Sequence, residues 1–86
     1  MKKIEPEPIG KITHYFGHLG VAVLKIENGS LMVGDEIQIK GATTDFKQKV
    51  DSMQIEHSKV EEAKVGDDIG LKVKEKVREH DDVYKV

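Results

Sequence analysis

Apolar and polar residues alternate along most of this 86-residue chain, and the alternation has a period of two. Residues 36–40 read Glu-Ile-Gln-Ile-Lys, and residues 69–73 read Ile-Gly-Leu-Lys-Val. In residues 12–16 the Ile, His and Phe side chains fall on one face. Residues 21–26 are almost uniformly apolar, as in a strand that is covered on both faces. A period of two predicts β-strands, because a buried helix face would repeat every 3.6 residues.

The middle of the chain breaks this regular pattern. Within residues 46–55 the apolar positions change parity, and a β-bulge near residues 51–52 would account for the change while bending the strand. Residues 58–61 read Ser-Lys-Val-Glu, which has the letters of a helix capping box. Gly66 follows so soon that we expect no more than about one turn of helix there.

Four glycines are predicted to serve as structural turn positions: Gly29, Gly34, Gly66 and Gly70. Gly29 completes an Asn-Gly pair, in which both residues tolerate positive φ. Gly34 and Gly66 each precede an acidic residue and the start of an apolar strand. Gly70 lies inside an apolar alternation, where a missing side chain lets a neighbouring backbone approach closely.

Six or so short strands, ending with a last strand over residues 83–86, indicate an all-β fold. A barrel is favoured over a sandwich, because closure removes the exposed edges of so many strands. No internal repeat or change of composition marks a second domain. The sequence therefore predicts an extended N-terminal segment over residues 1–8 and a single β-barrel domain over residues 9–86.

Three stretches, in this order, carry a resemblance to a known family. They are residues 29–39 (GSLMVGDEIQI), residues 53–71 (ending VEEAKVGDDIGL) and residues 81–86 (DDVYKV). Together they resemble domain 2 of the translational GTPases, as found in elongation factor Tu, initiation factor two and elongation factor G. The resemblance implies a small closed antiparallel β-barrel of six to seven strands, standing alone without the GTPase.

Composition and charge narrow the possible functions. The chain has no cysteine, which excludes a disulfide framework, a zinc ribbon and a thiol nucleophile. It begins without the apolar run of a signal peptide and has no stretch of about 20 apolar residues, so we expect a cytoplasmic protein with no membrane partner. A formal net charge of −2 gives no overall attraction to nucleic acid, so such binding would need a local basic patch.

The sequence offers no convincing catalytic or cofactor site. It lacks the G-x-x-x-x-G-K-[ST] phosphate loop, so no nucleotide is expected, and none of its serines has a placed base. His14 and His18 are four residues apart, about 13 Å on an extended chain, which is too far for one metal ion. We therefore expect no enzyme activity, no cofactor and no metal.

A basic pattern near the end of the chain is the main candidate site. Cationic side chains occupy alternate positions at Lys72, Lys74, Lys76 and Arg78. On a continuous strand they would share one face and form a ridge that contacts phosphates, helped by lysines 47 and 49 on another strand. The alternative is a solvated outer face, where lysines discourage edge-to-edge aggregation.

The resemblance adds three candidate contact residues: Lys25, Gln54 and His57. In elongation factor Tu this barrel helps hold the aminoacylated end of tRNA, and in other translational GTPases it contacts the small ribosomal subunit. Lys25 stands where the family has an arginine, but Leu24 replaces the preceding glycine. Gln54 stands in place of a carboxylate, and His57 aligns roughly with an arginine. These departures weaken aminoacyl recognition more than a generic RNA or ribosome contact.

Two functions from different classes follow. The first is a non-catalytic binding module that contacts tRNA, rRNA or a translation-related protein through the basic pattern. The alternative is a protein–protein adaptor that docks onto another enzyme or factor without binding RNA. The barrel itself is expected to be a monomer or a weak homodimer.

Overall fold

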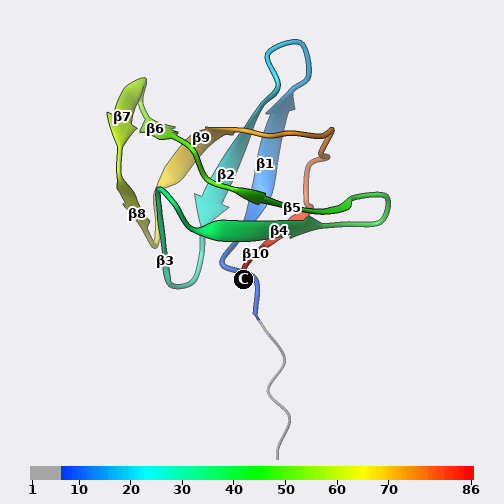
Figure 1. Cartoon of the computed structure of the whole chain (residues 1–86), viewed down its shortest axis with the longest axis horizontal. Coiled ribbons are helices and arrows are strands. Elements are labelled where there is room, and N and C mark those ends of the chain that lie inside the picture. Colours follow the sequence, from blue (N-terminus) through cyan, green and yellow to red (C-terminus); the bar gives the residue numbers. More distant parts are fainter. Residues whose placement is uncertain (1–6) are drawn as a thin grey trace, which may run out of the picture.

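The computed structural model describes residues 7–86 as ten β-strands, with no helix in that range. The predicted extended segment over residues 1–8 lies almost entirely outside the described residues. The strands curl around a common interior (Figure 1). Their bounds are β1 Gly10–Phe16, β2 Val21–Ile26, β3 Ser30–Met32, β4 Glu36–Lys40, β5 Asp45–Lys49, β6 Met53–Ile55, β7 Ser58–Val60, β8 Glu62–Lys64, β9 Asp68–Lys72 and β10 Asp82–Lys85.

Eight strands form one curled antiparallel sheet in the order β5-β4-β10-β1-β2-β9-β6-β7, and β3 pairs with β8 in a small second sheet. The C-terminal strand β10 sits between β4 and β1, so the end of the chain is built into the middle of the sheet. The all-β barrel-type fold is thus confirmed. Within residues 7–86 the structure has ten strands, where six to seven were expected. Four of the ten, β3, β6, β7 and β8, have only three residues each, and such short strands leave little alternation in the sequence.

The core follows the alternation of the sequence in most strands. Ile37 and Ile39 of β4 are fully buried, as are Ile69 of β9 and Leu24 of β2. Fully burying such a side chain stabilises the fold by about 1.5–3 kcal/mol. The first strand departs from the pattern, because its pairing with β2 shifts register between Ile12 and His14. This bulge buries Ile12 but leaves His14 and Phe16 exposed, so the three residues do not share one buried face.

The parity change after residue 50 has a different cause from the expected bulge. The chain leaves β5, which pairs with β4, and enters β6, which pairs with β9 and β7. Residues 51–52 connect two strands and are not a bulge within one. Residues 58–60 form strand β7 and not a helical turn, because Glu56 and His57 make a two-residue hairpin turn with φ of 49° and 68°.

Three four-residue turns share one design, over residues 32–35, 64–67 and 78–81. In each, the N–H of the closing aspartate donates to the carbonyl of the first residue, at 3.0, 2.9 and 3.2 Å. The N–H of the first residue in turn donates to the aspartate Oδ2, at 2.9, 2.8 and 2.9 Å. The third position has positive φ, as a type II turn requires, and is Gly34, Gly66 or His80.

Of the four glycines expected at turns, Gly29, Gly34 and Gly66 have positive φ. Gly70 differs: it lies within β9, and a Cβ there would meet only a Val21 methyl at 3.8 Å. The expected close approach of backbone at Gly70 is therefore wrong, because its neighbours stand at ordinary distance. The close approach occurs instead at Gly10, where a Cβ would overlap the backbone carbonyl oxygen of Lys25.

Candidate functional site

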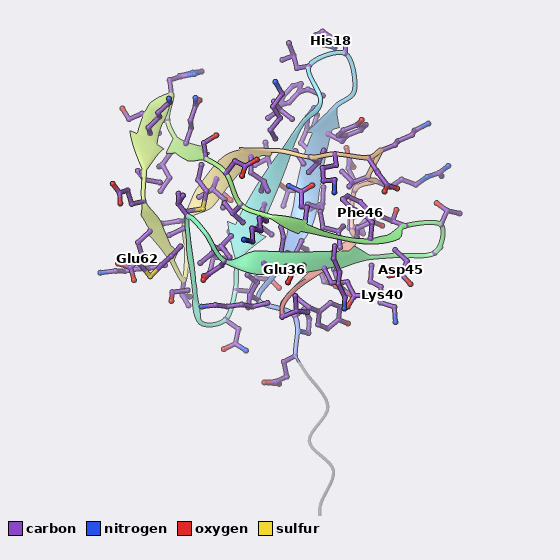
Figure 2. All side chains as sticks on the ribbon, viewed as in Figure 1. His18, Glu36, Lys40, Asp45, Phe46 and Glu62 are labelled. Atoms are coloured by element: carbon purple, nitrogen blue, oxygen red, sulfur yellow. The ribbon has the colours of Figure 1, made fainter. Side chains whose placement is uncertain are left out.

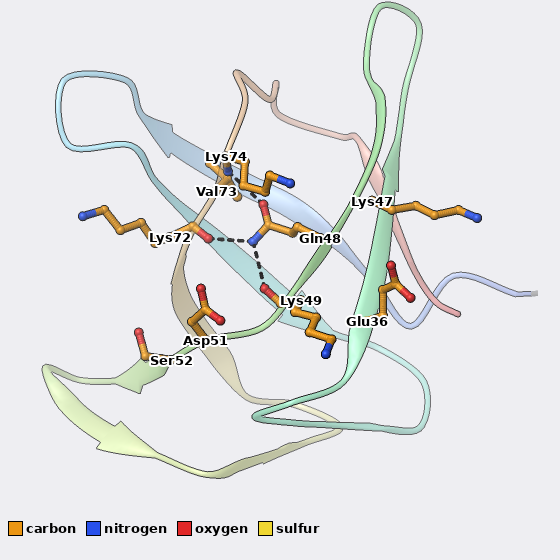
Figure 3. Close-up of a pocket in the computed structure, with 9 residues that line it drawn as sticks. All are labelled: Glu36, Lys47, Gln48, Lys49, Asp51, Ser52, Lys72, Val73 and Lys74. Carbon is orange, nitrogen blue, oxygen red and sulfur yellow. Dashed lines mark hydrogen bonds between the residues drawn. The ribbon is translucent and has the colours of Figure 1, made fainter.

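A hollow in the surface lies where β5 faces the end of β9 (Figure 3). We call it the seam groove; its volume is about 610 Å³. β5 is the last strand at one end of the sheet order, so no ladder of backbone hydrogen bonds joins it to β9. The groove is lined by Glu36, Lys47, Gln48, Lys49, Asp51, Ser52, Lys72, Val73 and Lys74.

A single side chain bridges this seam. The amide nitrogen of Gln48 donates to the carbonyl of Lys72 at 2.8 Å, and its oxygen accepts from the N–H of Lys74 at 2.8 Å. A primary amide offers a donor and an acceptor, as a peptide group does, so Gln48 replaces one rung of a strand ladder. The side chain is only 5% exposed, and its hydrogen bonds fix the width of the seam groove.

Four lysines stand around the bridge. Lys47 and Lys49 point outward because Gln48 between them points inward, and Lys72 and Lys74 flank buried Val73 in the same way. Within residues 7–86, no ammonium group of these four lies within 4.0 Å of a carboxylate. Together with Glu36 and Asp51, four cations and two anions give the groove a net charge of +2, opposite in sign to the chain's −2.

The predicted ridge along one continuous strand does not form. β9 ends at Lys72, and residues 73–80 are irregular, because the chain turns there toward β10. All four predicted side chains are nevertheless exposed above buried Val73 and Val77. Lys72 and Lys74 line the seam groove with the two lysines of β5, whereas Lys76 and Arg78 lie outside its lining.

The remaining candidate residues lie in separate places. Gln54 lines a smaller hollow of about 300 Å³, which shares Ser52 and Lys72 with the seam groove. His57 lies at the tip of the β6–β7 hairpin, and Lys25 pairs with Asp68 between β2 and β9. The structure therefore does not gather the predicted contact residues into one site.

The hairpin of β1 and β2, which turns at residues 17–20, is a further surface feature. It projects from the body of the sheet with His18 at its tip (Figure 2). Phe16 and Leu19 are exposed there, Leu19 to 56%, and the rings of His14 and Phe16 lie 4.5 Å apart. His14 also lies 3.7 Å from a carboxylate oxygen of Glu79. After the register shift between Ile12 and His14, Tyr15 packs against the core and Phe16 lies on the outer face.

Metal-binding clusters and unpartnered buried polar atoms are absent from residues 7–86. In that range no three His, Cys, Asp or Glu side chains gather to hold a metal ion. Every buried side-chain nitrogen or oxygen there has a hydrogen-bond partner. None of the described segments is a helix long and apolar enough to cross a membrane.

Sequence relatives of this chain are named as proteases. It is 47% identical over 78 residues to a collagenase of Porphyromonas gingivalis, a match that covers 90% of this chain. It is 40% identical over 84 residues to an uncharacterized protease of Methanocaldococcus jannaschii, covering 96% of this chain. The chain spans only about a fifth of the length of these relatives, 22% and 20%. These matches support the protein-adaptor alternative better than the RNA-binding hypothesis.

A solved structure has the same fold. The C-terminal domain of a putative U32 peptidase from Geobacillus thermoleovorans superposes with a TM-score of 0.87, covering 93% of this chain and 92% of that one. Its sequence identity is 20%, so this similarity concerns the fold alone. The family model for elongation factor Tu domain 2 matches residues 20–82, well over half of the chain. The chain therefore belongs to the elongation factor Tu domain 2 family.

Proposed function

We propose that this barrel is a non-catalytic accessory domain that docks onto a peptidase domain of the U32 type. The observation that carries the proposal is the identity of 47% and 40% to about a fifth of two proteins named as proteases. The greater part of each relative lies outside the match, and that part is where we place their catalytic residues. The proposal holds for a peptidase domain in the same polypeptide or in another.

The surface of the barrel is consistent with a binding role. Within residues 7–86, every fully buried side-chain nitrogen or oxygen atom has a hydrogen-bond partner, so no buried polar atom is left without a structural role. The exposed features are a lysine-rich groove, an edge strand and a projecting hairpin with an exposed phenylalanine. Grooves, open edges and exposed aromatic side chains are typical of protein-recognition surfaces.

The competing RNA hypothesis has weaker support in the same geometry. Single-stranded RNA is usually held by aromatic side chains that stack on bases beside the cations. No aromatic residue lines the seam groove, and Tyr15 and Tyr84 are half-buried elsewhere. Two carboxylates, Glu36 and Asp51, lie among the four lysines and would repel phosphates.

Direct binding measurements test the proposal. The chain would be titrated by calorimetry against the Methanocaldococcus protease from which the matching segment has been deleted. In parallel, a mixed tRNA pool would be titrated at about 50 and 300 mM salt, since phosphate contacts weaken steeply over that range. We expect saturable binding to the truncated protease and none to tRNA at the higher salt. Saturable, salt-sensitive tRNA binding without protease binding would contradict the proposal.

A further inference from the structure

We infer that the seam groove receives an extended, acidic segment of the partner protein, which lies along the open edge of β5. This inference rests on the proposed docking function and names the chemistry of the contact. The groove carries a net charge of +2, whereas the whole chain carries −2. The groove therefore attracts an anionic ligand that the rest of the chain would repel.

The lysine spacing matches an extended peptide. Lys47 and Lys49 occupy alternate positions of β5, and side chains two residues apart on a strand are separated by about 6.6–6.8 Å. Acidic side chains at alternate positions of an extended partner segment repeat at the same interval. Lys72, the last residue of β9, and Lys74, in the irregular segment after it, stand on the opposite wall of the groove. A segment between the walls can therefore pair with cations on both sides.

The backbone of β5 also faces the groove. Val50 directs its N–H to the carbonyl of Asp35 and its carbonyl to the N–H of Gly34, both at 2.9 Å and both away from the seam. Because backbone groups alternate in direction along a strand, those of Lys47 and Lys49 point toward the seam. The Lys49 carbonyl lies 3.5 Å from the Gln48 amide, which agrees with this direction. An extended peptide can hydrogen-bond to such an edge, as in β-strand addition.

Two other occupants fit less well. A second copy of this chain would bring the lysines of its own β5 into the groove, and like charges at an edge disfavour pairing. Nucleic acid would meet Glu36 and Asp51 without an aromatic side chain in the groove to stack its bases. An acidic peptide meets the same two carboxylates, but it needs no stacking surface, because its backbone pairs with the edge and its carboxylates pair with the four lysines.

The test uses labelled peptides and the intact chain. The probe is a fluorescent ten-residue peptide of alternating glutamate and threonine, and its control has glutamine in place of glutamate. Backbone amide shifts in the NMR spectrum locate binding, and fluorescence anisotropy measures affinity. We expect only the acidic peptide to bind, with shifts at Lys47, Lys49 and residues 72–74. Equal binding of both peptides, no binding, or shifts elsewhere would overturn the inference.

Charge-reversal variants test whether the lysines of β5 bind the acidic peptide. Lys47→Glu together with Lys49→Glu should weaken acidic-peptide binding by about tenfold or more. The matched control, Lys11→Glu with Lys64→Glu, changes two exposed lysines outside the groove and should change affinity less than about twofold. Equal effects of the two pairs would contradict the inference. Tighter binding of a ten-nucleotide oligouridylate than of the acidic peptide would identify a nucleic-acid site and overturn it too.

Failure of this inference can be told apart from failure of the proposed function. If the truncated protease binds the chain and the β5 double variant equally well, the docking function stands but the seam groove is not its site. If the acidic peptide binds in the groove but the protease does not, the groove chemistry is right and the proposed partner is wrong.

Discussion

The side-chain oxygen of Gln48 accepts a 2.8 Å hydrogen bond from the backbone N–H of Lys74, 26 residues further along the chain. With the bond from its nitrogen to the Lys72 carbonyl, this amide joins the edge strand β5 to the segment after β9. The barrel is thus held at its seam by a side chain, and the same arrangement leaves a groove lined by four lysines.

Replacing Gln48 by alanine should lower the free energy of unfolding by about 1–3 kcal/mol, because it leaves a partly buried carbonyl and N–H without partners. Urea denaturation followed by circular dichroism measures the change. Gln38→Ala is the matched control, since Gln38 donates only to the exposed Asp45 side chain, and we expect a loss of about 0.5 kcal/mol or less. Equal losses in the two variants would show that the seam bridge adds no stability.

Of the three four-residue turns closed by an aspartate, the one over residues 78–81 has a residue other than glycine at its positive-φ position. His80 has a φ of 76°, where the equivalent Gly34 has 98°. We expect His80→Gly to raise the free energy of unfolding by about 0.5–1 kcal/mol and Gly34→Ala to lower it by at least as much. Thermal unfolding of the two variants compares them directly. A destabilised His80→Gly variant would mean that the imidazole makes a compensating contact.

The hairpin between β6 and β7 should accept a better turn sequence. Glu56 and His57 both have positive φ, a requirement that Asn-Gly meets with less strain. We expect the Asn-Gly replacement to stabilise the fold by about 1 kcal/mol, which raises the melting temperature by about 4–8 °C in a domain of this size. An unchanged or lower melting temperature would contradict this turn geometry. Because His57 is also a predicted contact residue, the same variant should be titrated with the protease partner.

Gly10 and Gly70 make a matched pair of substitutions. Alanine at Gly10 places its Cβ against the backbone carbonyl of Lys25, and that backbone lies inside the β1–β2 pair. We expect a loss of about 2 kcal/mol or more, or failure to fold. Alanine at Gly70 meets only a methyl group at ordinary distance and should change stability by less than about 1 kcal/mol. The reverse order of stabilities in urea denaturation would refute this packing.

Local patterns predicted much of the fold. Alternation in residues 36–40 and 69–73 identified the buried faces of β4 and β9 correctly, and the glycine–aspartate pairs marked two of the three aspartate turns. The third turn escaped notice because its usual signal is glycine, and His80 stands there instead. Exposure of the four predicted cations was also foreseeable, since Val73 and Val77 between them are apolar and buried.

The candidate site could be predicted only in part, because it depends on contacts between distant segments. The parity of residues 46–50 indicated that Gln48 points inward, but its partners lie 24 and 26 residues away. No local pattern shows that β5 ends as an edge strand facing Lys72. The groove therefore appears only when the sheet order is known, whereas the lysines that line it are visible in the sequence.

The most direct test of the docking account is hydrogen–deuterium exchange of this chain, alone and with the truncated protease. Slower exchange confined to residues 45–49 and 72–74 is the result that the account predicts, because a bound segment would cover the seam groove and pair with the edge of β5. Unchanged exchange across the whole chain at saturating protease, or slowing that appears only with RNA, would contradict it.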